Sequence, residues 1–401
     1  MIITKLKINN LYSFNDVEID FTYPKKNPKS NIESEYLEER PKFNFKRVCI
    51  LMGTNASGKT SLGKVICGIE NFIHKKTIVS YLSQGICDKD DVAKIEVEFI
   101  TPSNYQIHRI FLEFEDSAFP LKDIVYQSLP LLKTDSNLSI RKKLDKHLEG
   151  VKIPRSCLIS GEKELVQDKF NRFKEIDFLD MSWNFVFSEN HSNDFKLARN
   201  SSISESLILK ILQTFDSSIK DVKALFTEEK EGKRTRKKIE GYSVYFNNGN
   251  SIKVSDNGQV FSDTDKNRLS KGTYDVLSIT DFIASIIDEN KFGENLISST
   301  HFLDEKLSSS HSELERSLLN LMIHKLPKRS QMFYTTHNYD ILEMNLPTHS
   351  YLFMYKKYGE TYVVQPENEF SKNDRSLLGY VKNNYFCTIP QTSLIDELVW
   401  E

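Results

Sequence analysis

The chain has 401 residues, and its 54 Lys and Arg residues against 56 Asp and Glu residues leave a formal net charge of −2. A hydrophobic fraction of 39% with 11% aromatic residues excludes a mostly disordered chain. The near-neutral charge excludes a uniformly basic nucleic-acid coat but leaves open DNA contact through a local basic patch. No stretch approaches the roughly 18 apolar residues of a membrane-spanning helix, and the opening residues lack the apolar core of a secretion signal. We therefore expect a cytoplasmic protein with no membrane partner.

The first third of the chain predicts strands, then a loop and a helix. Alternation of apolar and polar residues predicts strands at residues 5–8, 17–21 and 94–114. The polar, proline-containing residues 23–42 predict an exposed loop. Val48–Met52 is a short apolar run, typical of a strand that is buried on both faces. Apolar residues then recur at helical spacing over residues 62–73, so a helix is expected after the intervening glycine-containing loop.

The middle of the chain is charged and less regular than its flanks, and it predicts an insertion with helical stretches such as residues 138–150. We expect a first α/β part at residues 1–125, an inserted, mainly helical subdomain at 126–204 and a second α/β part at 205–401. The predicted fold class is α/β with a mixed sheet.

The last part predicts both helices and strands. Helical spacing predicts helices at residues 204–226, 276–287 and 314–321, and apolar runs predict strands at residues 332–335 and 351–354. Asn247–Asn250 contains Asn-Gly between two alternating runs, which strongly indicates a β-hairpin.

The segment Gly53–Thr60 matches the pattern G-x-x-x-x-G-K-[ST] between the predicted buried strand and the predicted helix. Glycines let backbone N–H groups turn inward around phosphate oxygens, and the helix N-terminus adds partial positive charge. In such a loop Lys59 meets the β- and γ-phosphates, and Thr60 offers a hydroxyl to Mg²⁺. The sequence therefore predicts a site for a nucleoside triphosphate. The residues expected to contact the nucleotide are Gly53, Asn55, Ala56, Ser57, Gly58, Lys59, Thr60 and Ser61.

Three weaker motifs follow in order. Leu269–Thr273, with Ser270 at a helix-cap position, precedes an apolar helix; Asp304 and Glu305 follow two apolar residues; and His337 ends the run Thr335-Thr336-His337. Asp304 is expected to hold Mg²⁺, and Glu305 to orient and polarise the attacking water. Each motif alone has an ordinary structural explanation. Together they are more specific, because each step between them is about one helix and one strand long.

With these motifs the sequence resembles the ABC-type ATPases of the SMC, RecF and OLD-like group. Gly53–Thr60 is similar to the Walker A motif of that group, Leu269–Thr273 to its signature, Asp304-Glu305 to its Walker B motif, and His337 to its switch histidine. Residues 304–314 and Leu377–Pro390 look like segments of the stand-alone ATP-binding proteins of phage defence, of the AbiL-like abortive-infection type. The resemblance covers roughly residues 1–115 and 205–390.

The resemblance implies a P-loop ABC-type head that binds ATP and Mg²⁺ and works as a homodimer or higher homo-oligomer. Ser270, Lys271 and Gly272 would cap the ATP of a second copy in trans, Glu305 would be the base, and His337 would sense the γ-phosphate. Thr60 and Asp304 would be the metal ligands. Lysine follows Glu305 where proline is common, and the segment before Asp304 is polar for a buried strand. We therefore expect slow hydrolysis, with ATP acting mainly as a dimer clamp.

The function implied is that of a cytoplasmic sensor ATPase in bacterial anti-phage defence that controls a partner effector, a nuclease or toxin encoded nearby. Two alternatives stay open: a RecF-like repair ATPase that clamps DNA, and a non-hydrolysing scaffold held together by ATP. The basic run Lys233–Lys238 is either a nucleic-acid patch or, with the preceding glutamates, a solvated loop. Arg141 and His147 have the spacing of an RNase pair, which also arises by chance in a charged helix.

Overall fold

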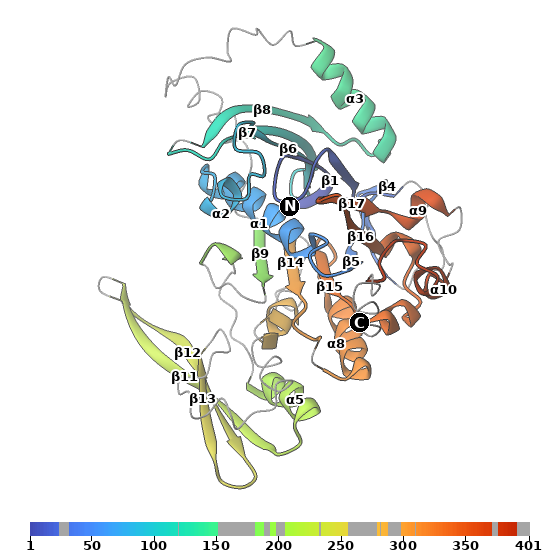
Figure 1. Cartoon of the computed structure of the whole chain (residues 1–401). Coiled ribbons are helices and arrows are strands. Elements are labelled where there is room, and N and C mark those ends of the chain that lie inside the picture. The colour runs from blue at the N-terminus through green and yellow to red at the C-terminus, as the bar shows by residue number, and fades with distance from the viewer. Residues whose placement is uncertain are drawn as a thin grey trace.

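The computed structural model describes residues 1–23, 32–118, 120–150, 181–187, 193–197, 205–231, 234–255, 279–280, 282–287, 298–308, 310–370 and 376–390. Within these residues the strands form sheets of seven, five, three and two strands (Figure 1). No helix of this described part is both long enough and apolar enough to cross a bilayer.

The seven-stranded sheet, called the main sheet below, has the strand order β10-β9-β14-β15-β5-β16-β17. Its strands are β5 (Val48–Gly53), β9 (Met181–Val186), β10 (Lys196–Leu197), β14 (Ser298–Asp304), β15 (Gln331–Thr336), β16 (Tyr351–Lys357) and β17 (Glu360–Val364). The five strands from β9 to β16 are parallel, and the edge strands β10 and β17 are antiparallel to their neighbours. Every residue of β5, β14 and β15 is buried, as expected for parallel strands that are covered on both faces.

The five-stranded sheet, called the antiparallel sheet, has the order β2-β1-β6-β7-β8. Its strands are β1 (Ile2–Asn9), β2 (Val17–Asp20), β6 (Ala93–Thr101), β7 (Gln106–Phe114) and β8 (Leu121–Pro130). In β1 and β2 buried and more exposed residues alternate, because one face of these strands packs inward and the other faces outward. The strands predicted at residues 5–8, 17–21 and 94–114 are confirmed.

The helices lie around these sheets (Figure 1). The α-helices are α1 (Lys59–Lys75), α2 (Ser80–Ser83), α3 (Asn137–Gly150), α5 (Glu205–Phe215), α8 (Ser312–Lys325), α9 (Pro366–Glu369) and α10 (Leu378–Lys382), and the 3₁₀ turns are η4 (Asn193–Phe195), η5 (Tyr339–Glu343) and η6 (Thr348–Ser350). Residues 279–280 and 282–287 are also helical. The helices predicted after the glycine-containing loop and at residues 314–321 are confirmed.

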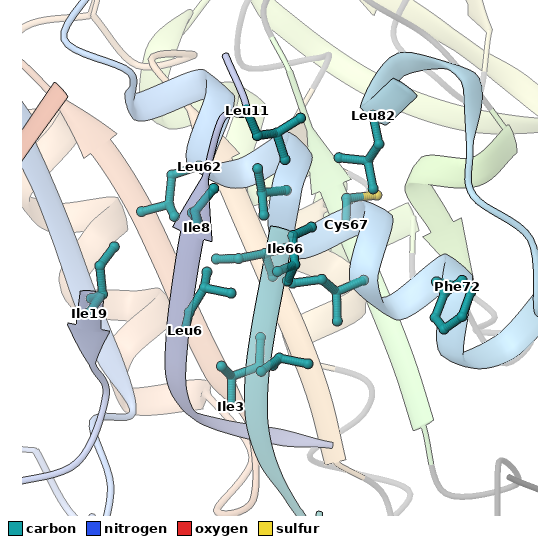
Figure 2. Packing of buried hydrophobic residues seen from close by; sticks show 14 of the residues in the cluster. Ile3, Leu6, Ile8, Leu11, Ile19, Leu62, Ile66, Cys67, Phe72 and Leu82 are labelled. Carbon is teal, nitrogen blue, oxygen red and sulfur yellow. The ribbon is translucent and has the colours of Figure 1, made fainter. Parts of the chain in front are cut away.

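Alternate residues of β5 face two different hydrophobic cores. Cys49 and Leu51 join a core between the antiparallel sheet, α1 and the main sheet, where Leu6 and Ile8 of β1 pack near Leu62 of α1 (Figure 2). Val48, Ile50 and Met52 join a second core with α5 and α8. The main sheet is therefore a middle layer, and α1, which begins at the glycine-containing loop, is fixed against it.

Three strands form the arm, named here for the way it extends away from the main sheet (Figure 1). They are β11 (Ile219–Glu231), β12 (Arg234–Phe246) and β13 (Ser251–Ser255). The predicted hairpin at Asn247–Asn250 is confirmed by the pairing of β12 with β13. The helix predicted over residues 204–226 is wrong beyond Phe215, because β11 begins at Ile219. A register shift between Ile219 and Asp221 puts buried residues three apart, a spacing that imitates a helix.

Two other segments differ from their predictions. The loop expected over residues 23–42 contains β3 (Tyr36–Leu37) and the start of β4 (Arg40–Asn44) in its described part, and Leu37 packs in a small core with α3. The expected insertion at 126–204 contains α3, but it also includes the end of β8 and all of β9, which pairs with β14 in the main sheet. The division into 1–125, 126–204 and 205–401 is otherwise still a prediction.

Candidate functional site

The loop Gly53–Thr60 joins the end of β5 to the start of α1, which is the predicted strand, loop and helix order. Gly53 lies opposite Met354 of β16, and a Cβ at Gly53 would stand 2.0 Å from the Met354 carbonyl oxygen, so only glycine fits there. Gly58 has φ +100° at the helix start, and Ala56 is also left-handed at φ 59°. The loop therefore curls tightly in front of the N-terminus of a 17-residue helix.

The parallel strands beside β5 end at the same edge of the main sheet. In the register, Gly53 is the last residue of β5, Thr336 pairs with Met52, and Asp304 pairs with Thr335. The carboxyl ends of β5, β15 and β14 therefore bring the glycine loop, His337 and Asp304-Glu305 together. This edge is where ligands bind in many open α/β sheets.

The Lys59 side chain lies across the loop. Its Nζ donates to the carbonyl oxygens of Gly53 at 3.0 Å and Thr54 at 3.1 Å. It also lies 3.3 Å from Glu305 Oε1 and 3.3 Å from His337 Nε2. The side chain is only 4% exposed, and burial lowers its pKa, although Glu305 opposes that shift. One cation therefore links the loop to both catalytic candidates.

Asp304 and Thr60 form the candidate metal site. The Thr60 hydroxyl donates to Asp304 Oδ2 at 2.7 Å, and the Thr335 hydroxyl donates to Asp304 Oδ1 at 2.8 Å. A hydroxyl beside a carboxylate is the hard oxygen donor set that suits Mg²⁺, so the two predicted ligands fit that ion. Burial raises the pKa of Asp304, and the hydroxyls of Thr60 and Thr335 oppose this shift. Among the described residues no group of three or more His, Cys, Asp and Glu side chains could hold a metal ion.

Glu305 stands in a left-handed backbone conformation, with φ 50°, directly after β14. This conformation costs energy for a residue with a Cβ, and it is held by a hydrogen bond from the Glu305 N–H to the Thr335 hydroxyl at 2.9 Å. The side chain, 30% exposed, reaches His337 Nε2 at 2.8 Å. The contact with His337, supported by Lys59, lowers the pKa of Glu305. Glu305 is therefore ionised at neutral pH and can accept a proton.

The other contact residues predicted in the glycine-containing segment lie in or beside the loop. Asn55 and Ala56 are exposed, Ser61 is partly exposed in α1, and Ser57 is fully buried. Ser270, Lys271 and Gly272 lie outside the described residues.

Sequence reasoning missed the residues that brace the site. The Thr361 hydroxyl of β17 donates to the Ser57 carbonyl at 3.0 Å and contacts the Ser13 hydroxyl at 2.7 Å, so the turn after β1 supports the glycine loop. Thr335 serves both Asp304 and Glu305. The polar run Thr335-Thr336-His337 at the end of an apolar strand was a signal for Thr335, but no local pattern marks Thr361.

The polar start of β14 has a structural explanation. Ser299 contacts Ser330 at 2.5 Å and His301 Nε2 at 3.0 Å, so these buried groups are hydrogen-bonded to one another. Arg141 likewise has a structural role, because its guanidinium pairs with Asp20 at 2.5 Å and Glu98 at 2.9 Å. An RNase role for Arg141 is therefore not favoured.

The site therefore consists of a glycine-containing loop, a buried lysine and two acidic side chains at one edge of a mainly parallel sheet in a mixed α/β fold. No protein-family model and no curated protein matches the chain. A solved structure entitled "Structure of the recombination mediator protein RecF-ATP in RecFOR pathway" is similar, with a TM-score of 0.39 and 9% identity, over 90% of this chain and 97% of that one.

Proposed function

We propose that the chain is an ABC-type ATPase head that binds ATP with Mg²⁺ and hydrolyses the nucleotide slowly. The observation that carries this proposal is the convergence of Lys59, Thr60, Asp304, Glu305 and His337 at one edge of the main sheet. Five side chains meet there, two from the start of α1 and three from the ends of β14 and β15, although up to 278 residues separate them. Packing alone does not require this combination of charges.

Each residue has a role that its surroundings support. Lys59 and the loop N–H groups would bind the β- and γ-phosphates, and Thr60 with Asp304 would hold Mg²⁺, which would neutralise phosphate charge. Glu305, ionised and next to His337, would take the proton from the attacking water. His337, bonded to Glu305 and close to Lys59, would contact the γ-phosphate. The exposed fractions of Glu305 and His337, 30% and 35%, leave both reachable from solvent.

The test is Mg-ATP binding and hydrolysis by wild type and Glu305→Gln. The amide keeps the size of the side chain but cannot act as a base, so we expect turnover to fall by about 100-fold or more while the ATP dissociation constant changes little. The matched control is Glu313→Gln, at a side chain that is 71% exposed. Wild-type hydrolysis by Glu305→Gln would exclude Glu305 as the base.

We further propose that two copies assemble with ATP between them and that Ser270, Lys271 and Gly272 of one copy cap the nucleotide of the other. The motif order and the polar site edge support this arrangement. From the resemblance to the phage-defence group we also propose a sensor role in bacterial anti-phage defence, acting through a partner effector such as a nuclease or toxin. Residues 304–314 and Leu377–Pro390 carry the resemblance to that group.

A DNA-clamping ATPase of the RecF type is the alternative. The described register of the arm places Glu228, Glu229 and Glu231 opposite Lys237, Arg236 and Arg234. In the sequence, the glutamates that precede the basic run offset part of its charge, which favours a solvated arm over a DNA patch. Salt-dependent DNA binding that strengthens with ATP would favour the clamp instead.

A further inference from the structure

Glu315 of α8 is a buried carboxylate beside the segment that carries His337. It is 2% exposed and stands at the first position of the buried stripe of α8, followed by Leu318, Leu319, Met322 and Ile323. An acidic side chain on the apolar stripe of a helix costs free energy unless hydrogen bonds satisfy it.

Three neutral donors from β15 and the following residues satisfy the carboxylate. Tyr334 and Thr336 donate their hydroxyls to Oε1 at 2.5 Å and 2.7 Å, and Asn338 donates its amide to Oε2 at 2.8 Å. The Asn338 N–H also donates to the Thr336 hydroxyl at 3.0 Å. Thr336 and Asn338 are the residues immediately before and after His337. Glu315 therefore binds the side chains of the residues on both sides of the histidine.

Two further contacts join α8 to the same segment. The Ser312 hydroxyl lies 2.5 Å from Asp340 Oδ2, and the Arg316 guanidinium lies 3.6 Å from Glu343. Ser312, Glu315 and Arg316 have i, i+3 and i+4 spacing, so they share one face of α8. That face is aligned with residues 336–343, and Glu315 is the buried member of the set.

We infer that Glu315 is a positioning residue that holds His337 against Glu305 and Lys59. This inference rests on the proposed hydrolysis at that site. In the chain, α8 follows Glu305 closely, and His337 Nε2 lies 2.8 Å from Glu305 Oε1. The Glu315 carboxylate therefore links α8 to the same segment that contacts Glu305. Without Glu315, the residues flanking His337 would lose their common acceptor. The imidazole would then sample positions away from Glu305.

The first test is the steady-state kinetics of Glu315→Gln. Glutamine keeps the size but replaces one acceptor oxygen with an N–H group that cannot accept from Tyr334, Thr336 or Asn338. We expect kcat to fall about tenfold or more, with the KM and the dissociation constant for Mg-ATP changing less than about threefold, because displacement by a fraction of an ångström affects chemistry more than binding. Glu313→Gln on the same helix is the control and should match wild type.

The second test separates positioning from a general structural role. If Glu315 acts through His337, the double variant Glu315→Gln with His337→Ala is no slower than His337→Ala alone. If the fold-reductions in kcat of the two single variants multiply in the double variant, the inference is overturned. Asn338→Ala, which removes one donor and keeps the carboxylate, should lower kcat in the same direction, and it decides the question if Glu315→Gln does not fold.

The outcomes distinguish this inference from the proposed function. A wild-type protein that does not hydrolyse ATP overturns both. A wild type that hydrolyses ATP, together with Glu315→Gln or Asn338→Ala at the wild-type kcat, overturns the positioning role alone.

Discussion

Lys59 is a buried cation, and the groups that it contacts belong to the site. Its Nζ contacts the Gly53 and Thr54 carbonyls, Glu305 and His337. The side chain is only 4% exposed. An isolated buried ammonium costs free energy, so these contacts hold the amine in place, facing the loop. Phosphate oxygens would be stronger partners than carbonyls for this charge.

Removal of the Lys59 charge tests that role. We expect Lys59→Ala to raise the dissociation constant for Mg-ATP by about tenfold or more, a loss of about 1.4 kcal/mol or more in binding free energy. Isothermal titration calorimetry measures this directly. Lys64→Ala, one turn and a half along the same helix, is the matched control. Equal ATP affinity of Lys59→Ala and wild type would contradict the assignment.

At the residue scale the sequence predicted the parts of the site whose spacing is local. Gly53–Thr60 was predictable because the steric demands of a phosphate loop fix its glycines and lysine within eight positions. Thr335 and Thr361 were not, since their roles arise only when β15 and β17 lie next to the loop. Glu315 had a signal, a carboxylate on an apolar helix stripe, but its partners depend on the register of α8 against β15.

At the scale of elements, α1 carries a second buried carboxylate away from the site. Glu70 is 1% exposed, and burial raises its pKa to about 7. The pKa of this carboxyl is higher in the folded state than its ordinary value of 4.5. Its protonation therefore stabilises the folded state, and this contribution is fully present below pH 4.5. That contribution is lost as the pH rises through about 7.

This linkage predicts a pH-dependent stability that Glu70→Gln removes. Between pH 4.5 and 8 the free energy of unfolding of wild type should fall relative to that of the variant by about 3 kcal/mol. Denaturant titrations at pH 5, 6.5 and 8 measure the difference. Glu39→Gln, at a side chain that is 56% exposed, is the control and should follow wild type. Parallel pH profiles of wild type and Glu70→Gln would show that Glu70 is not the responsible group.

Prediction of elements succeeded where the apolar period was regular. Alternation identified β1, β2, β6 and β7, and a buried apolar run identified β5, because burial on one or two faces leaves a direct trace in the sequence. It failed at β11, where the register shift near Ile219 changed the period. It also failed at β9, because this strand of the main sheet lies in the charged middle part of the sequence. Neither failure could be avoided without knowing the pairing partner.

At the scale of the whole molecule, the site lies at one edge of the main sheet, and the antiparallel sheet and α8 support it from opposite sides. Thr361 of β17 donates to the glycine loop and is itself contacted by Ser13 of the turn after β1, while Glu315 accepts from the residues beside His337. Both sets of contacts lie at the same edge of the main sheet. Under the proposed function, ATP at that edge becomes part of the interface with a second copy.

The most direct test of the central claim is the solution mass of wild type and Glu305→Gln, each with and without Mg-ATP, together with the nucleotide retained. Multi-angle light scattering after size exclusion gives both the mass and the fraction for nucleotide analysis. We predict that Mg-ATP drives a larger species and that Glu305→Gln, unable to hydrolyse its nucleotide, keeps this species and its ATP for longer than wild type. A mass that is indifferent to ATP in both proteins, with no ATP retained by either, would contradict the account.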